Sequence, residues 1–290
     1  MIASMLGGHA SVNCLPESQF ISEYALLEKP VPELVDLVLR HDRFRLWGIL
    51  LTTEQVDRLR VATDFSAMIT LLADFYAKYH GRGPRATWLE HAPSSVSAFL
   101  RLAGIYPQAR FIHVIRDGRA VAASWLRQDW GPRHVLTVAD VWGMRLAQGL
   151  AAEAAMPERV LRLHYEDVVR APEDSMRRVT NFLELDFDAA MLDARGFILP
   201  GHSKSTHGLL TNDSQKGISC ARLESWRGEL SARQIELFEQ RSGDLLPLLG
   251  YSLTQRGATA PTRLETVALL LGELWGRLVN LRRRKRRHRI

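Results

Sequence analysis

Apolar residues follow two different spacings along this chain, and the two alternate. A near-continuous apolar run at Phe111 to Ile115 predicts a short strand buried in a parallel sheet, and Val160 to Leu163 is expected to form a second strand. Spacings of three and four residues predict helices through most of residues 18–80. Residues 134–156, which include Val141 to Ala155, are expected to form another helix, and Pro172 marks the start of a further one. Strands that alternate with helices are typical of an α/β fold, which is the fold class we expect.

The turn after the first of these strands carries the most informative chemistry. Arg116 ends the strand, Gly118 is expected to permit a tight turn, and an amphipathic helix follows. The first turn of a helix offers unpaired N–H groups and a positive dipole end, and an arginine fork suits phosphate oxygens. Ser124, two helical turns further on, is expected to reach the same phosphate. The pattern predicts an anion site, with a solvated arginine-rich turn as the plain alternative.

This segment resembles the 3'-phosphate-binding motif of sulfotransferases that use 3'-phosphoadenosine 5'-phosphosulfate (PAPS), in which an Arg and a Ser eight residues apart hold the phosphate. Three later segments resemble the same family in the same order: LRLHYEDVVRAPEDSMRRVTNF from Leu161, KGISCARLESW from Lys216 and LLPLLGY from Leu245. The resemblance implies that Tyr165 contacts the adenine part of the cofactor. It also implies that Lys216 and Ser219 reach the cofactor phosphates.

The resemblance implies a P-loop-like, three-layer α/β fold with a central parallel sheet over residues 1–252, closest to tyrosylprotein sulfotransferases and bacterial enzymes. Met5 to Phe20 resembles the helix and loop that follow the family's Arg-Ser-Gly-Thr-Thr loop, so the first strand and this 5'-phosphosulfate loop are missing from the chain as written. We expect a start codon chosen too late, because loss of a central strand exposes hydrogen-bonding edges and apolar surface. A truly truncated or degenerate member is the alternative.

Two further residues take catalytic roles through the resemblance. Glu17 stands where tyrosylprotein sulfotransferases carry their catalytic glutamate, and it would take the proton of the acceptor. The alternative is a carboxylate placed near a helix start for dipole reasons. TWLEHAP, from Thr87 to Pro93, resembles the family's Trp-x-Glu-Lys-x-Pro motif, with His91 in the position of the lysine that stabilises the leaving oxygen. An imidazole titrates near neutral pH, so it would do this with a pH dependence that lysine lacks.

The chain as written lacks the cation of the 5'-phosphosulfate loop and has His91 in place of the family's lysine. We therefore expect little turnover by the 290-residue chain. The alternatives to an active sulfotransferase are a nucleotide-binding pseudoenzyme and an inactive fragment. A phosphoryl transferase would need a P-loop lysine and Mg²⁺ ligands, and the sequence has no Walker-type lysine loop. Cys14 and Cys220 form neither a disulfide framework nor a metal-ligand cluster, so we expect no metal and a reducing, cytoplasmic location.

Charge is concentrated at the C-terminus. The net charge is +6, and Arg282 to Arg289 holds seven positive charges, so the remainder sums to −1. This tail follows an apolar-rich helical stretch, Thr262 to Leu281, within a C-terminal segment over residues 253–290. The pattern favours two interpretations equally: a helix on a membrane surface with its basic end on anionic lipid, or a helix packed on the domain or on a partner subunit. Nucleic acid is not expected because no recognition module accompanies the charge. The acceptor substrate and the oligomeric state cannot be read from the sequence.

Overall fold

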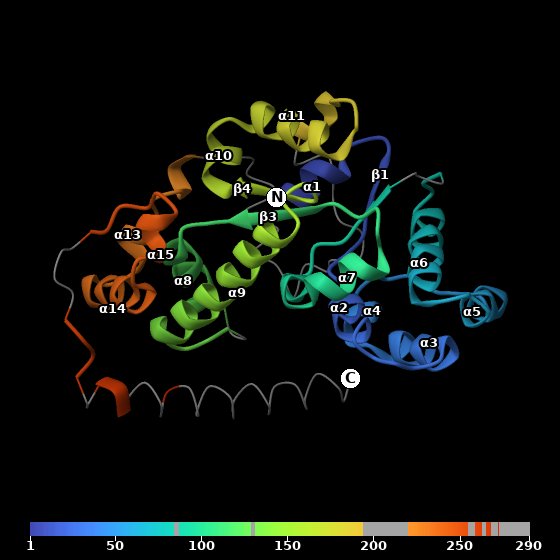
Figure 1. The fold of residues 1–290 in the computed structure, drawn as a ribbon, viewed down its shortest axis with the longest axis horizontal. Coiled ribbons are helices and arrows are strands. Elements are labelled where there is room, and N and C mark those ends of the chain that lie inside the picture. Colours follow the sequence, from blue (N-terminus) through green and yellow to red (C-terminus); the bar gives the residue numbers. More distant parts are fainter. Residues whose placement is uncertain are drawn as a thin grey trace. The chain divides into compact units, whose positions relative to one another are not determined.

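The computed structural model describes residues 1–83, 87–128, 131–193, 220–254, 259–262, 265–267 and 272. The chain divides into two compact units, and Figure 1 traces it in colour. Unit 1 contains residues 1–113, 151–163 and 167–219, and unit 2 contains residues 114–150, 164–166 and 220–290. The division passes through two strands and two helices, so neither unit is a continuous stretch of sequence.

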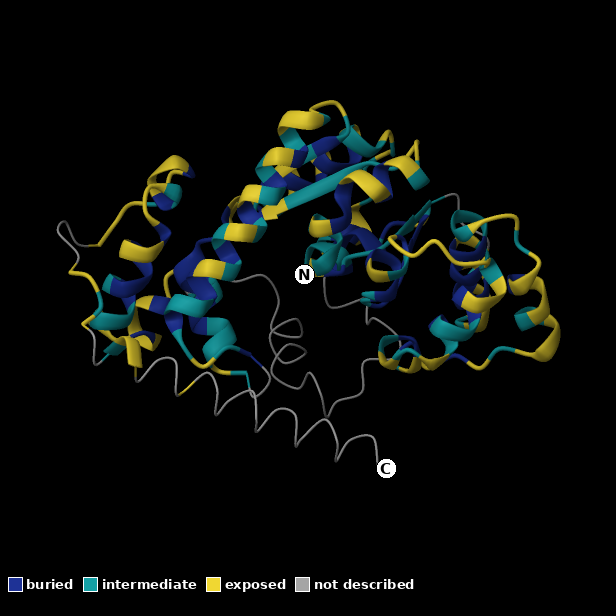
Figure 2. Cartoon of the chain, turned by 60° about the horizontal axis from the view of Figure 1, so that its bottom comes forward, coloured by how far each residue is buried: buried dark blue, intermediate teal, exposed yellow. Residues whose placement is uncertain are grey.

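The first part of unit 1 is helical, as the apolar spacing predicts. Its helices are α1 (Ile2–Gly7), α2 (Phe20–Tyr24), α3 (Val31–Arg40), α4 (Asp42–Arg45), α5 (Thr53–Arg60) and α6 (Phe65–Tyr79). Their largest buried cluster contains the fully buried rings of Phe20, Trp47 and Tyr76. Buried residues run along one side of many helices and exposed residues along the other (Figure 2), which is the amphipathic pattern that confirms the prediction.

Two short strands of unit 1 form a parallel pair. Strand β1 (Val12–Cys14) lies beside β2 (Thr87–Leu89), with Val12 opposite Thr87 and Cys14 opposite Leu89. The Leu15 N–H continues the ladder by donating to the Leu89 carbonyl at 2.9 Å. Because the strands are parallel, the segments that follow them leave from the same end of the pair.

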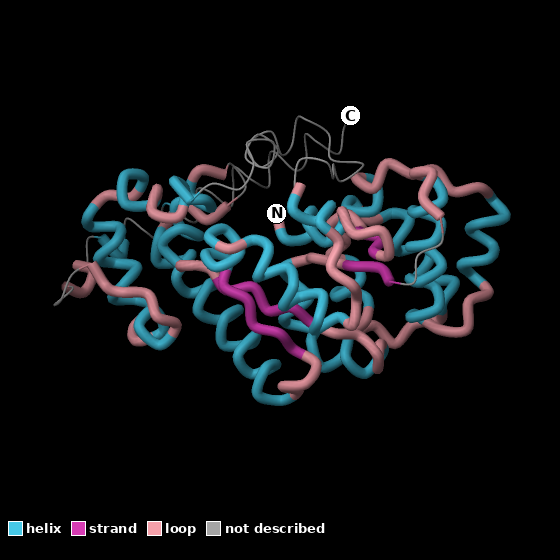
Figure 3. The backbone as a smooth tube through the Cα atoms, turned by 90° about the horizontal axis from the view of Figure 1, so that it is seen from above, coloured by secondary structure: helices cyan, strands magenta, loops and turns pink. Residues whose placement is uncertain are grey.

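The two predicted strands are confirmed as β3 (Phe111–Ile115) and β4 (Val160–His164), which pair with each other (Figure 3). The predicted complete burial is wrong for β3, in which Val114 is 42% exposed and only Ile115 is buried. The physical reason is that β3 has one strand neighbour in the described part of the chain, so one edge and part of a face remain open. A run of apolar residues does not report how many strands lie beside it.

Two helices of the phosphate motif region follow β3. Helix α8 (Gly118–Leu126) starts at the predicted turn, and α9 (Val135–Ala155) confirms the helix predicted over residues 134–156. The start of α9 has a local cause, since the His134 ring accepts a hydrogen bond from the Leu136 N–H at 3.1 Å. A side-chain cap of this kind satisfies a backbone donor that the first helical turn leaves unpaired.

The remaining elements complete both units. They are the 3₁₀ helix η1 (Pro93–Ala98), α7 (Phe99–Ile105), α10 (Tyr165–Arg170), α11 (Pro172–Leu183), the 3₁₀ helices η2 (Ala189–Leu192) and η3 (Cys220–Arg222), α13 (Trp226–Glu229), α14 (Ala232–Ser242) and α15 (Leu245–Leu248). Proline opens α11 as predicted, because its missing N–H is one that the first turn would leave unpaired.

The expected single central sheet differs from what the described residues show. Their four strands form two two-stranded sheets, β1–β2 and β3–β4. Strand order depends on pairing between residues far apart in sequence, which apolar spacing cannot report. Two predictions lie outside the described residues: the contacts of Lys216 and Ser219 with the cofactor, and the basic tail from Arg282 to Arg289. In the part that the structure describes, no helix combines the length and hydropathy of a membrane span.

Candidate functional site

Arg116 lies where the sequence places it, directly after β3 and before α8. Its guanidinium carbon lies 4.3 Å from the centre of the Tyr165 ring, so the cation stacks over the aromatic face. The carbonyl of Arg116 accepts a hydrogen bond from the Trp142 indole N–H at 3.2 Å, which fixes the backbone at this point. The Nε atom of Arg116 is buried and makes no hydrogen bond within the described residues. The Nε–H group of Arg116 is therefore a fixed, partly buried donor that has no acceptor among the described residues.

Arg119 belongs to the same turn but is fully engaged. It donates to both carboxylate oxygens of Asp117, to Glu239 at 2.6 Å and to the Ser252 carbonyl at 2.9 Å. Its side chain is 2% exposed, and its guanidinium also lies over the Trp226 ring. Burial alone lowers the pKa of Arg119, but the hydrogen bonds to Asp117 and Glu239 outweigh burial and raise it. The turn therefore offers one arginine, Arg116, to an anion.

Gly118 has a different function from the predicted one. It is the first residue of α8 and has a negative φ, so the turn does not need the freedom of glycine there. A Cβ atom at this position would lie 2.5 Å from the Phe238 ring and 2.8 Å from the Trp142 ring. The glycine is required because two aromatic rings approach the backbone closely, which the local sequence does not reveal.

Glu166 joins the ends of β3 and β4. Its carboxylate is buried and accepts hydrogen bonds from the Asp117 N–H at 3.0 Å and from the Tyr251 hydroxyl at 2.9 Å. Glu166 follows Tyr165, and Asp117 follows Arg116. The hydrogen bond from the Asp117 N–H to Glu166 therefore holds Arg116 beside Tyr165. Sequence reasoning missed this residue, although it is the Glu of the Tyr-Glu-Asp turn.

The other predicted cofactor residues are placed as follows. Tyr165 is the first residue of α10, immediately after β4, as predicted. Ser124 lies on α8 and is partly buried, and no described interaction joins its hydroxyl to Arg116. The structure thus brings Arg116 and Tyr165 together and leaves the role of Ser124 untested.

Glu17 and His91 lie in unit 1, on the segments that follow β1 and β2. Glu17 precedes α2 by three residues, which disfavours the helix-start alternative because dipole effects are confined to the first turn. Its carboxylate accepts a hydrogen bond from Gln19 at 2.9 Å and lies 3.4 Å from the Arg43 guanidinium. Gln19 is itself strained: φ is 51°, and the Phe20 N–H closes a γ-turn onto the Ser18 carbonyl at 2.5 Å.

His91 has one buried ring nitrogen without a partner. Its Nε2 atom makes no hydrogen bond within the described residues. Burial lowers the pKa of His91 below the ordinary value of 6.5, while the negative charges of Glu90 and Glu17 oppose part of that decrease. The ring is therefore neutral at physiological pH and has a free nitrogen.

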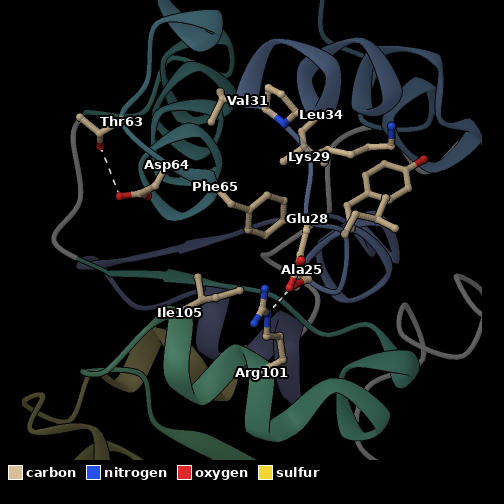
Figure 4. Close-up of a pocket in the computed structure, with 13 residues that line it drawn as sticks. Ala25, Glu28, Lys29, Val31, Leu34, Thr63, Asp64, Phe65, Arg101 and Ile105 are labelled. Carbon is tan, nitrogen blue, oxygen red and sulfur yellow. Dashed lines mark hydrogen bonds between the residues drawn. The ribbon is translucent and has the colours of Figure 1, made fainter.

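A separate open cavity of about 420 Å³ lies in unit 1 (Figure 4). It is lined by the α2–α3 connection, the start of α6 and helix α7, where Arg101 donates to the Ala25 carbonyl at 2.8 Å. Neither Glu17 nor His91 lines this cavity. Among the described residues, no group of His, Cys, Asp and Glu side chains is arranged to hold a metal ion.

Comparisons with curated proteins point to one family. A family model described as the sulfotransferase family matches residues 1–189. A putative protein-tyrosine sulfotransferase of Caenorhabditis elegans is 23% identical over 63% of this chain and 71% of its own length. Protein-tyrosine sulfotransferase 1 of Danio rerio is 25% identical over 79% of this chain and 62% of its own length. Nodulation protein NoeE of Sinorhizobium fredii is 25% identical over 68% of this chain and 51% of its own length.

Two solved structures resemble the fold. The sulfotransferase domain from the curacin biosynthetic pathway has a TM-score of 0.58 and 16% identity, over 87% of this chain and 93% of that domain. The sulfotransferase domain from the Synechococcus PCC 7002 olefin synthase has a TM-score of 0.63 and 21% identity, over 87% of this chain and 90% of that domain. These similarities confirm the predicted α/β, P-loop-like fold class.

Proposed function

Since the chain belongs to the sulfotransferase family, we propose that it binds PAPS and transfers the sulfuryl group to a hydroxyl or amine acceptor. The observation that carries this proposal is Arg116, a partly buried arginine that stacks on Tyr165 and whose buried Nε atom has no hydrogen-bond partner among the described residues. An arginine held in this way at a strand end is suited to a phosphate group. Every other charged side chain of its turn is neutralised by a partner.

The residues present fit the cofactor. Arg116 and Ser124 would hold the 3'-phosphate, Tyr165 would contact the adenine part, and Lys216 with Ser219 would reach the cofactor phosphates. The buried Arg116 Nε atom, which has no hydrogen-bond partner among the described residues, is a donor that such an anionic group would satisfy. When bound, PAPS supplies an activated sulfuryl group on a phosphate leaving group.

Glu17 would accept the proton that the acceptor hydroxyl or amine loses. Its contacts with Gln19 and Arg43 hold the carboxylate in one orientation, and its side chain is 20% exposed, so it is reachable. His91 would donate a hydrogen bond from Nε2 to the developing negative charge. A neutral imidazole does this less strongly than a lysine cation, which is the reason that we expect low turnover.

The acceptor is proposed by class only. The C. elegans and D. rerio relatives carry protein-tyrosine in their names, so a tyrosine-containing peptide is the first acceptor to test. The second candidate function, a nucleotide-binding pseudoenzyme, is favoured by the neutral His91 in the lysine position and predicts binding without turnover. We also propose a catalytic domain over residues 1–252, followed by a separate C-terminal segment.

Calorimetric binding of 3'-phosphoadenosine 5'-phosphate to the full chain tests the proposal. Arg116→Ala should weaken binding by about tenfold to a hundredfold, the value of one or two charge-assisted hydrogen bonds. Arg127→Ala is the matched control, because Arg127 caps the same helix but is exposed and paired with Glu229. Equal binding by the two variants, or no binding by the native chain, would overturn the proposal. Binding without sulfuryl transfer to any tested acceptor would establish the pseudoenzyme.

A further inference from the structure

Glu90 is surrounded by three hydrogen-bond donors from two segments. One carboxylate oxygen accepts from the Ser18 hydroxyl at 2.9 Å and from the Ala92 N–H at 2.6 Å. The other oxygen accepts from the Ser95 hydroxyl at 2.8 Å. Ser18 is fully buried, so its bond to Glu90 is shielded from water. A carboxylate with this many donors is fixed in place.

The positions of these partners relate Glu90 to the proposed catalytic residues. Ser18 follows Glu17 on the segment after β1, and Glu90 precedes His91 on the segment after β2. Both segments leave the parallel pair from the same end, because Cys14 lies opposite Leu89. Beyond the last ladder bond at Leu15, the Ser18–Glu90 hydrogen bond joins the two segments directly beside Glu17 and His91. A second bond, between the Ser22 and Ser94 hydroxyls at 2.6 Å, joins them farther along the chain.

We propose that Glu90 is a positioning residue whose hydrogen bond to Ser18 ties the Glu17 segment to the His91 segment. The tie sets how closely the carboxylate of Glu17 approaches the imidazole. The catalytic value of this arrangement rests on the proposed function, but the tie itself does not.

Three variants separate the effect of the Ser18–Glu90 bond from the effect of the other contacts of Glu90. Ser18→Ala removes the Ser18–Glu90 bond between the segments and leaves the Ser22–Ser94 bond in place. Ser95→Ala is the matched control, because it removes a hydroxyl bond of similar length to the same carboxylate but on the His91 side. Glu90→Gln keeps the shape of the side chain and can retain the bond to Ser18 through its amide oxygen, while it removes the charge.

The readout is the pKa of His91 in the full chain, followed by NMR with labelled histidine and assigned with His91→Gln. The charges that act on this ring are those of Glu90, Glu17 and the amino group of Met1. Glu17→Gln should lower the pKa of His91, because the carboxylate of Glu17 raises it. This shift measures the coupling between the two residues without any need for activity.

The tie predicts that the coupling depends on Ser18. In the Ser18→Ala chain, the shift that Glu17→Gln causes should fall to roughly half or less of its native size, as expected for a double-mutant cycle through a shared bond. In the Ser95→Ala and Glu90→Gln chains it should persist. The proposal would be overturned if Glu17→Gln shifts the pKa of His91 equally in the Ser18→Ala and Ser95→Ala chains. It would also be overturned if Glu17→Gln causes no shift in the native chain.

The outcome is separable from the proposed function. Binding of 3'-phosphoadenosine 5'-phosphate depends on Arg116 in unit 2 and is measured independently. A chain that fails to bind this nucleotide but loses the Glu17–His91 coupling on Ser18→Ala would support the tie and overturn the function. If the chain does turn over, Ser18→Ala should lower kcat more than it raises KM, because substrate binding does not require the tie.

Discussion

Arg116 and Arg119 lie three residues apart, but their surroundings give them different roles. Arg119 is buried with Asp117 and Glu239, so its charge is used inside the protein. Arg116 lies over Tyr165 and keeps a donor without a partner in the described residues. The phosphate motif therefore contains one arginine that we propose binds the phosphate and one arginine that holds the turn through buried hydrogen bonds.

Arg119→Met tests this division at the residue scale. Removal of one member of a buried charge network leaves the other carboxylates unpaired and costs about 3–5 kcal/mol of unfolding free energy. Arg241→Met is the control, because its pair with Asp140 is about half exposed and should contribute no more than about 1 kcal/mol. Urea unfolding monitored by circular dichroism measures both. Similar losses in the two variants would show that the Arg119 network does not stabilise the fold.

At the scale of elements, some residue types are required by tertiary packing and others by local hydrogen bonds. Gly118 begins α8 because the rings of Phe238 and Trp142 leave no space for a side chain. Helices α5 and α14 instead start on local signals, since Thr52 with Gln55 and Ser231 with Gln234 form capping boxes. The second kind of signal can be read from sequence, and the first cannot.

Gly118→Ala should destabilise the protein by about 1–3 kcal/mol, the usual cost of forcing a methyl group into a packed core. Gly228→Ala in α13 is the matched control, because a Cβ atom there meets nothing within 4 Å. This control should be neutral or stabilising by up to about 1 kcal/mol, since alanine favours helix more than glycine. Thermal unfolding compares the two, and the same sign of effect for both would contradict the packing explanation.

Ser231→Ala should cost about 1 kcal/mol of unfolding free energy, because the Gln234 N–H would lose its acceptor in the α14 capping box. Ser231→Asp is the control that restores an acceptor and should recover most of the loss. Denaturant unfolding measures both variants. If alanine and aspartate behave alike, the cap does not contribute to stability.

For the whole molecule, stability should decrease as the solution is acidified below the ordinary histidine pKa. Burial lowers the pKa of His91, so the unfolded chain binds protons more readily than the folded one once pH falls below 6.5. Stability is therefore lost from that pH down to the folded pKa. The free energy of unfolding between about pH 7.5 and about pH 5.5 should change less steeply in His91→Asn. An unchanged slope would show that His91 is not buried in its neutral form.

Charge distribution is also a whole-molecule property. With seven positive charges at Arg282 to Arg289, the membrane-surface interpretation predicts co-sedimentation with vesicles that contain phosphatidylserine, weakened by salt. A chain ending at residue 281 should lose this binding, and phosphatidylcholine vesicles should bind neither chain. Equal binding with and without the tail would leave the alternative, a helix packed on the protein itself.

The sequence by itself determined the positions of β3 and β4, the helical character of residues 18–80, the start of α11 and the order of the family motifs. These depend on neighbours within a few residues, through apolar spacing, caps and proline geometry. The tertiary structure alone decided that Arg116 is available while Arg119 is not, that Gly118 is required by packing, and that Glu90 and Glu166 hold strand ends together. Each of these depends on contacts between segments distant in sequence, because burial and charge compensation are set by what packs against a side chain rather than by what precedes it.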